Sequence, residues 1–207
     1  MRKIFFTALA FTAFVACRNE DKAKTSEAAT SMVQPEKVMT KAEQDKAWME
    51  YMTPGSAHEL MARSNGTWEA DITMWMHPDS PAVKTKGVAV YRSILGGRYQ
   101  EGVHTGDMMG MPFEGRSILA FDNAKKVWLS SWIDNMGTGM MNMEGNYDEG
   151  TKTLSTKGKM VDPTTGKDCD VRETVTWLDD NTQKMEMYCN MHGREFKTME
   201  LTARRKK

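Results

Sequence analysis

From Gly66 onward, the chain alternates apolar and polar residues with a period of two, which is the pattern of β-strands with one buried face. In the first such stretch, Trp68, Ile72 and Met74 alternate with polar residues. Nine further strand-length segments follow, and turn signals such as Gly96-Gly97 separate the segments from one another. These lie near 84–94, 98–106, 112–122, 127–134, 139–147, 153–161, 168–178, 184–191 and 195–204. No gap holds an amphipathic stretch of helix length, so neighbouring strands are expected to pair antiparallel.

Ten sequential antiparallel strands leave two free sheet edges unless the sheet closes on itself. Closure into an up-and-down barrel removes both edges, and a small barrel of this kind can enclose one small ligand. We therefore expect an all-β fold with an antiparallel barrel of about ten strands over residues 66–207. A two-sheet sandwich is the alternative, and the short connections between the strands disfavour it.

The N-terminal residues have the organisation of an export signal. Arg2 and Lys3 precede an apolar stretch over 4–15, and small Ala16 precedes Cys17. The residues FVAC resemble a bacterial lipobox, with Phe14 where Leu is usual. That resemblance implies a lipoprotein signal peptide over 1–17, acylation of Cys17, and a lipid-anchored protein of the bacterial cell envelope, periplasmic or surface-exposed.

Two segments separate this signal from the barrel. Residues 18–39 are polar and poor in aromatic residues, which predicts a disordered tether. Capping boxes formed by Thr40 with Glu43 and by Ser56 with Glu59 predict short helices within 40–65.

The start of the first strand resembles that of the calycin superfamily, which includes lipocalins, fatty-acid-binding proteins and nitrobindins. A short helix leads into Gly66-Thr67-Trp68. The resemblance implies that Trp68 plugs the base of the barrel beneath an Arg of the last strand. Arg204 or Arg205 is placed for that role, and Arg204 is our assignment.

Longer stretches resemble an uncharacterised bacterial family, domain of unknown function 1579. They are HELMARSNGTWEADITMWMHP, ILGGRY, GDMMGMPFEG, WIDNMGTG, VRETV and EFKTMELT. The resemblance extends from about Gly55 to Arg205 and implies the barrel fold, but it implies no activity.

Charge and motifs exclude several functions. Lys+Arg and Asp+Glu number 28 each, so the chain lacks the basic excess of a nucleic-acid-binding protein. The sequence has no G-x-S-x-G, P-loop or dinucleotide fingerprint. A binding protein is therefore favoured over an enzyme.

A hairpin at Gly96-Gly97 places Arg92 opposite Glu101. The two residues share a face with Val90 and Val103, so the pair is a candidate polar contact inside the barrel. A slip of one residue would place it on the surface instead, and both alternatives stay open.

The hairpin formed by 168–178 and 184–191 provides a second polar candidate. Its register places Glu173 on an apolar face opposite Met187, where desolvation would raise the pKa of the carboxyl. The residue is either a site residue or half of an ion pair with an interior Arg. Cys169 and Cys189 share this face, so a disulfide is expected after export.

The chain contains 20 methionines. Runs such as Met140-Met141-Asn142-Met143 suggest Cu(I) ligands, but only alternate residues of a strand share a face. Because methionine fills irregular apolar space, a cavity lining is the better interpretation. The proposed lining methionines are Met74, Met141, Met143, Met185 and Met187.

Haem is the other metal option, because nitrobindin-like barrels hold haem through one His. His58 is expected on a helix, His77 and His192 at turns, and His104 on the outward face, so none is placed inside.

These observations favour a barrel that binds a small apolar or amphipathic molecule, with no resident cofactor or metal. Arg92, Glu101 and Glu173 would orient the ligand. The alternatives are a haem- or copper-binding barrel, an enzyme that uses Glu173 as acid or base, and a structural envelope protein whose barrel is filled by side chains.

Overall fold

The computed structural model describes residues 38–191 and 193–207. The signal segment, Cys17 and nearly all of the tether lie outside these residues. Two helices precede ten strands: α1 (Lys41–Met52), α2 (Ser56–Ala62), β1 (Gly66–Met74), β2 (Val83–Ile94), β3 (Tyr99–Met108), β4 (Met111–Asp122), β5 (Val127–Asp134), β6 (Met141–Asp148), β7 (Thr153–Asp162), β8 (Lys167–Asp179), β9 (Thr182–Met191) and β10 (Arg194–Arg205).

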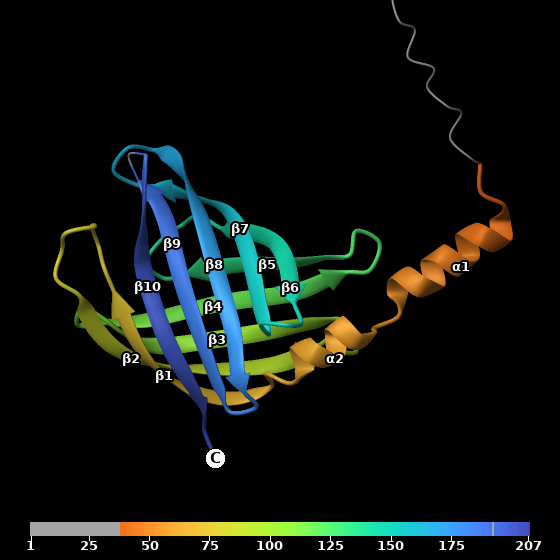
Figure 1. Cartoon of the computed structure of the whole chain (residues 1–207), viewed down its shortest axis with the longest axis horizontal. Coiled ribbons are helices and arrows are strands. Elements are labelled where there is room, and N and C mark those ends of the chain that lie inside the picture. Colours follow the sequence, from red (N-terminus) through yellow and green to blue (C-terminus); the bar gives the residue numbers. More distant parts are fainter. Residues whose placement is uncertain (1–37, 192) are drawn as a thin grey trace, which may run out of the picture. The chain divides into compact units, whose positions relative to one another are not determined.

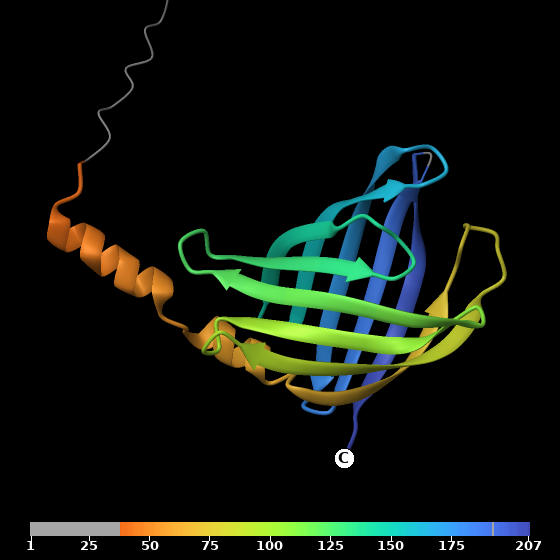
Figure 2. The same cartoon turned by 180° about the vertical axis from the view of Figure 1, so that it is seen from behind.

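The ten strands form one closed barrel (Figure 1). Each strand pairs antiparallel with its neighbours in sequence, and β1 closes the barrel by pairing with β10. Seen from behind, β2 to β5 cross in front of β8 to β10, so the two walls enclose an interior (Figure 2). The prediction of an antiparallel up-and-down barrel is confirmed, and the sandwich alternative is excluded.

Local capping determines where the two helices begin. The Thr40 hydroxyl accepts a hydrogen bond from the Glu43 N–H, and the Glu43 carboxylate accepts one from the Thr40 N–H at 2.8 Å. The second helix differs from expectation, because its N-cap is Gly55, whose N–H donates to His58 Nδ1 at 3.0 Å. Within the described ranges, no helix has the length and apolar character needed to cross a bilayer.

One end of the barrel is closed by α2 and the residues after it. Met61 packs against Trp128 and Leu154 in a buried cluster. The Ser64 hydroxyl accepts hydrogen bonds from the Trp177 indole and the Gln183 amide at 3.0 and 2.8 Å. This end is therefore filled by side chains, and any accessible interior lies further along the barrel.

Trp68 is fully buried at the same end. Its indole N–H donates to the Ser64 carbonyl at 2.8 Å, and the Arg205 guanidinium carbon lies 4.4 Å from its ring centroid. Gly66 has φ +123°, and a side chain there would contact the Arg205 guanidinium. The resemblance thus assigned the correct stack but the wrong arginine, since Arg204 points outward and pairs with Asp71 at 3.0 Å.

Candidate functional site: the interior of the barrel

The Trp68 plug determines which residues of β2 and β3 face the interior. Trp68 pairs with Ala89, and Ala89 pairs with His104, so these three positions share the inner face. The predicted pairing of Arg92 with Glu101 is present, but the two residues lie on the opposite, outer face.

The Arg92–Glu101 ion pair is therefore a surface feature. Arg92 Nη2 lies 2.6 Å from Glu101 Oε2, while the Arg92 side chain is 68% exposed. Val90 on the same face is 41% exposed. The expectation that Arg92 and Glu101 orient an internal ligand is wrong, because the register to β1 turns the Val-rich face to solvent.

The same inversion places His104 inside, where the sequence had assigned it to the outer face. Its Nε2 lies 3.2 Å from the Ser117 hydroxyl. The rings of Tyr91 and Trp132 meet the imidazole edge-on, with centroids 5.5 and 4.8 Å away. Desolvation lowers the pKa of His104 to about 4, so the imidazole is neutral at pH 7.

Gly102 and Gly115, two inward-facing glycines, make room for the His104 imidazole and the side chains around it. A Cβ at Gly102 would collide with the Ser117 hydroxyl, the His104 imidazole and the Tyr91 ring. A Cβ at Gly115 would lie 2.5 Å from the Trp132 ring. We call Tyr91, His104, Ser117 and Trp132 the aromatic–histidine cluster, and it exists because both glycines lack side chains.

Glu173 projects inward from the opposite wall. It pairs with Met187 of β9, as the hairpin register predicted, and with Thr156 of β7. No side chain in the described part of the chain forms a hydrogen bond or ion pair with its carboxyl. The alternative of a structural ion pair with an interior Arg is therefore wrong for the described residues.

Desolvation alone raises the pKa of Glu173 to about 7. The pKa of Tyr91 is also raised, first by desolvation and second by the charge of Glu173. The carboxyl and the phenol therefore interact electrostatically across one interior, although they belong to different walls.

The five proposed lining methionines all occupy inner positions of their strands. Met141 pairs with Trp132, Met74 pairs with Met199, and Met185 pairs with Leu201. Met143 is buried, and Met187 packs against the cluster that contains it.

Several inner side chains keep solvent-accessible surface even though they point into the barrel. Tyr91, His104, Ser117, Glu173 and Met185 are all only partly buried. Buried nitrogen or oxygen atoms without a hydrogen-bond partner do not occur among the described side chains, so the Glu173 carboxyl is open to accessible space. These inner side chains are therefore not fully packed against one another.

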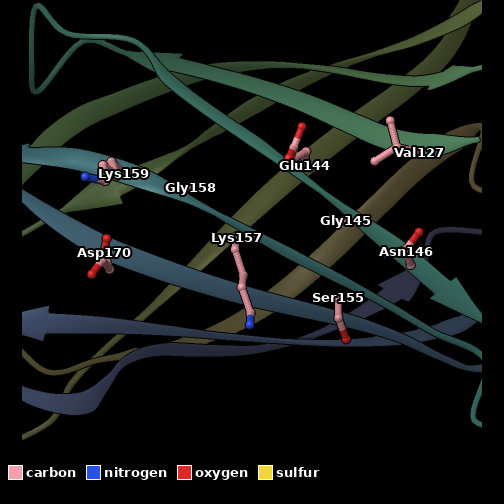
Figure 3. Close-up of a pocket in the computed structure, with 9 residues that line it drawn as sticks. All are labelled: Val127, Glu144, Gly145, Asn146, Ser155, Lys157, Gly158, Lys159 and Asp170. Carbon is pink, nitrogen blue, oxygen red and sulfur yellow. The ribbon is translucent and has the colours of Figure 1, made fainter. Parts of the chain in front are cut away.

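A depression also occurs on the outer face of β5 to β8 (Figure 3). Its exposed side chains carry both signs of charge, with Lys157 and Lys159 beside Glu144 and Asp170. This mixture defines no ligand class, and the barrel interior is the stronger candidate site.

The expected disulfide is absent. Cys169 and Cys189 are both buried free thiols. Their side chains share the inner face, but they pair with Met160 and Val171 and not with each other. In the described part of the chain, no group of three or more His, Cys, Asp or Glu side chains is arranged to hold a metal ion.

A closed ten-stranded antiparallel barrel with a Trp–Arg stack at its base defines a calycin-like protein. The chain belongs to the family described as "Protein of unknown function (DUF1579)", which it matches over residues 53–205. No curated protein matches the chain in sequence.

Two solved structures share this fold. Rv2717c from M. tuberculosis has a TM-score of 0.58 and 11% sequence identity, covering 75% of this chain and 100% of that chain. The S-type phycobiliprotein lyase CPES from Guillardia theta has a TM-score of 0.52 and 11% identity, covering 77% of this chain and 97% of that one. At this identity the similarity supports the barrel fold alone.

The calycin resemblance raised haem as a possible ligand. Because His104 lies inside the barrel, we can test whether its surroundings leave room for a haem. His104 Nε2 faces the Ser117 hydroxyl beside Gly102, and the ring is held edge-on by Tyr91 and Trp132. Nε2 thus points at the barrel wall, which leaves no room for a haem plane on that nitrogen. The cluster does not fit a haem bound through His104 Nε2.

Proposed function

We propose that this protein binds a small apolar or amphipathic molecule inside its barrel and acts as a carrier or sensor. The observation that carries the proposal is the Glu173 carboxyl, which faces accessible interior space without a hydrogen-bond partner among the described residues. A desolvated carboxyl without a partner is costly, and a ligand that hydrogen-bonds it removes that cost.

The charges of the inner face narrow the ligand class. The Arg205 guanidinium is occupied by Trp68 and by the Asn65 and Asp180 carbonyls. Among the described inner positions along the middle of the strands there is no other Lys or Arg to neutralise an anionic head group. The proposed ligand is therefore neutral or cationic, carries a hydrogen-bond donor for Glu173, and packs an apolar or aromatic body against Trp132 and the methionines.

Native mass spectrometry of the chain, purified gently from the cells that make it, tests this proposal. We expect an organic mass that leaves on denaturation. Glu173→Gln should reduce the bound fraction at least tenfold, whereas Glu144→Gln, an exposed outer-face control, should leave it unchanged. An apo mass in repeated preparations, or equal occupancy in both variants, would contradict ligand binding through Glu173.

A catalytic use of the same carboxyl is the second candidate. A general acid or base works best with a pKa near the working pH, and the pKa of Glu173 is raised to about 7. The two functions differ in one result. Glu173→Gln in an enzyme would retain a bound substrate unchanged in mass, whereas wild-type protein would release product.

We also propose that the chain is exported and anchored to the cell envelope through acylated Cys17. The support is the charged and apolar segment before Cys17 and the polar tether after it. Mass analysis of the mature N-terminus is the test. A diacylglyceryl group on Cys17 supports the anchor, whereas an intact Met1 or an unmodified Cys17 in membrane-extracted protein contradicts it.

A further inference from the structure

Helix α1 has an apolar side that the barrel does not cover. None of its residues is buried, and Trp48 is 62% exposed. Met49, Tyr51 and Met52 are also exposed, and the rings of Trp48 and Tyr51 meet edge-on with centroids 6.1 Å apart. Residues three and four positions apart share one side of a helix, so these four side chains lie together over its last two turns. We call them the α1 apolar face.

The barrel holds this helix by its C-terminal end. The Asn123 amide, in the turn between β4 and β5, donates to the carbonyls of Tyr51 and Thr53 at 3.1 and 2.8 Å. The last carbonyls of a helix have no partner within the helix, so Asn123 supplies hydrogen bonds that would otherwise go to water. An ordered helix that exposes large apolar and aromatic side chains on one side indicates a contact surface.

We propose that the α1 apolar face docks on the surface of a lipid bilayer, with Trp48 and Tyr51 at the level of the headgroups. Aromatic rings with one polar edge are enriched at this depth. The helix has two lysines against three acidic residues, so attraction to anionic headgroups does not drive the contact. Burial of apolar area drives it, and added salt should leave it unchanged.

The bilayer is the occupant because of where the chain leads, and this step rests on the lipid anchor proposed at Cys17. The 22 residues over 18–39 link that cysteine to α1, and their composition predicts a flexible tether. A flexible chain of this length has a root-mean-square end-to-end distance of about 26 Å. An anchor at Cys17 therefore holds α1 close to the bilayer and raises the local concentration of lipid at its apolar face.

Docking through α1 determines which end of the barrel faces the lipid. The β2–β3 turn and the end of β8 lie at the same end as Asn123 and expose Leu95 and Leu178. The opposite end also exposes apolar side chains, including Met140, but the chain toward Cys17 joins the barrel through α1. In this arrangement the base of the barrel faces the bilayer and the opposite end faces away from it.

The experiment measures quenching of tryptophan fluorescence by lipids whose acyl chains carry bromine. The full chain is reconstituted in phosphatidylcholine vesicles with and without the brominated lipid. The chain has six tryptophans, of which Trp48 is exposed and the other five are buried or partly buried. We expect quenching by the brominated lipid that disappears in Trp48→Phe and persists at high salt.

Two further variants locate the contact. Tyr51→Ser combined with Met52→Ser retains the Trp48 reporter but removes half of the α1 apolar face, and it should reduce the quenched fraction at least about twofold. Met140→Ser is the matched control, because this side chain at the opposite end is also 62% exposed, and it should change nothing.

The proposal is overturned if wild-type protein is not quenched, which is also the result expected for a protein partner or a second copy on this face. Quenching that persists in Trp48→Phe comes from another tryptophan, such as Trp75 at the opposite end, and overturns it as well. The mass of the N-terminus in the same preparation reports separately on the acylation of Cys17. Acylated protein without quenching would therefore refute the docking and leave the anchor intact.

Discussion

Replacing Glu173 with Gln should stabilise the folded protein at neutral pH and leave it almost unchanged at acid pH. Burial raises the pKa of Glu173 from 4.5 to about 7. Because a tenfold change in acid dissociation constant corresponds to about 1.4 kcal/mol, ionising this carboxyl in the folded protein costs up to about 3 kcal/mol. Water in the interior lowers the figure, so it is an upper bound.

The pH at which the gain appears follows from the two states. Below pH 4.5 the Glu173 carboxyl is protonated in both the folded and the unfolded chain, so its ionisation makes no contribution to the free energy of unfolding. Between pH 4.5 and 7 the unfolded chain releases the proton while the folded chain retains it, so wild-type stability falls as pH rises. Above pH 7 the wild-type protein shows the full loss of stability that ionisation of Glu173 causes.

Urea unfolding of the ligand-free wild-type protein and Glu173→Gln between pH 4.5 and 8 measures the difference. We expect the variant to gain up to about 3 kcal/mol at pH 8 and close to none at pH 4.5. The exposed control Glu144→Gln should show no such pH dependence. A difference independent of pH, or a variant less stable than wild type at pH 8, would mean that the carboxylate has a partner and would refute the reasoning.

The pKa of the wild-type His104 imidazole is lowered from 6.5 to about 4, so the free energy of unfolding of the wild-type protein falls by up to about 3 kcal/mol as the pH drops through that range. His104→Gln should remove this acid-induced loss of stability, which urea unfolding at pH 4 and 7 measures. Gly102→Ala should destabilise the fold by about 1–3 kcal/mol, because the new Cβ meets the Ser117 hydroxyl and the His104 ring; equal urea midpoints would contradict the close approach. Arg205→Met should cost about 2–4 kcal/mol through lost charged hydrogen bonds at the base, whereas Arg204→Met on the surface should cost less than about 1 kcal/mol in the same assay.

Turn chemistry allowed the sequence to predict strand pairing but not the direction of every face. The Gly96-Gly97 hairpin established the Arg92–Glu101 register correctly. The two faces of that hairpin are similar in polarity, and the face with more valines was assigned to the interior. Only the register between β1 and β2 resolves this choice. It depends on the connection over 75–82, which is too long for a turn rule to determine.

Glu173 was located correctly because its hairpin has unequal faces. Val171 and Val175 flank it on one side of β8, and Met185 and Met187 oppose that side from β9. The sequence pattern could also have identified Arg205 as the arginine at the base of the barrel. Leu201 and Ala203 alternate along β10, and the next residue on their face is Arg205.

The polar groups of the interior argue against a barrel that serves only as a packed scaffold. His104 and Glu173 are each held away from their usual pKa by desolvation, and neither has an opposite charge beside it. Leu or Met at either position would fill the space without that cost. Gly102 and Gly115 add to the argument, because each gives up apolar contact to leave room for the aromatic–histidine cluster. Under the proposed function, a ligand supplies the hydrogen-bond partner that the Glu173 carboxyl lacks among the described residues.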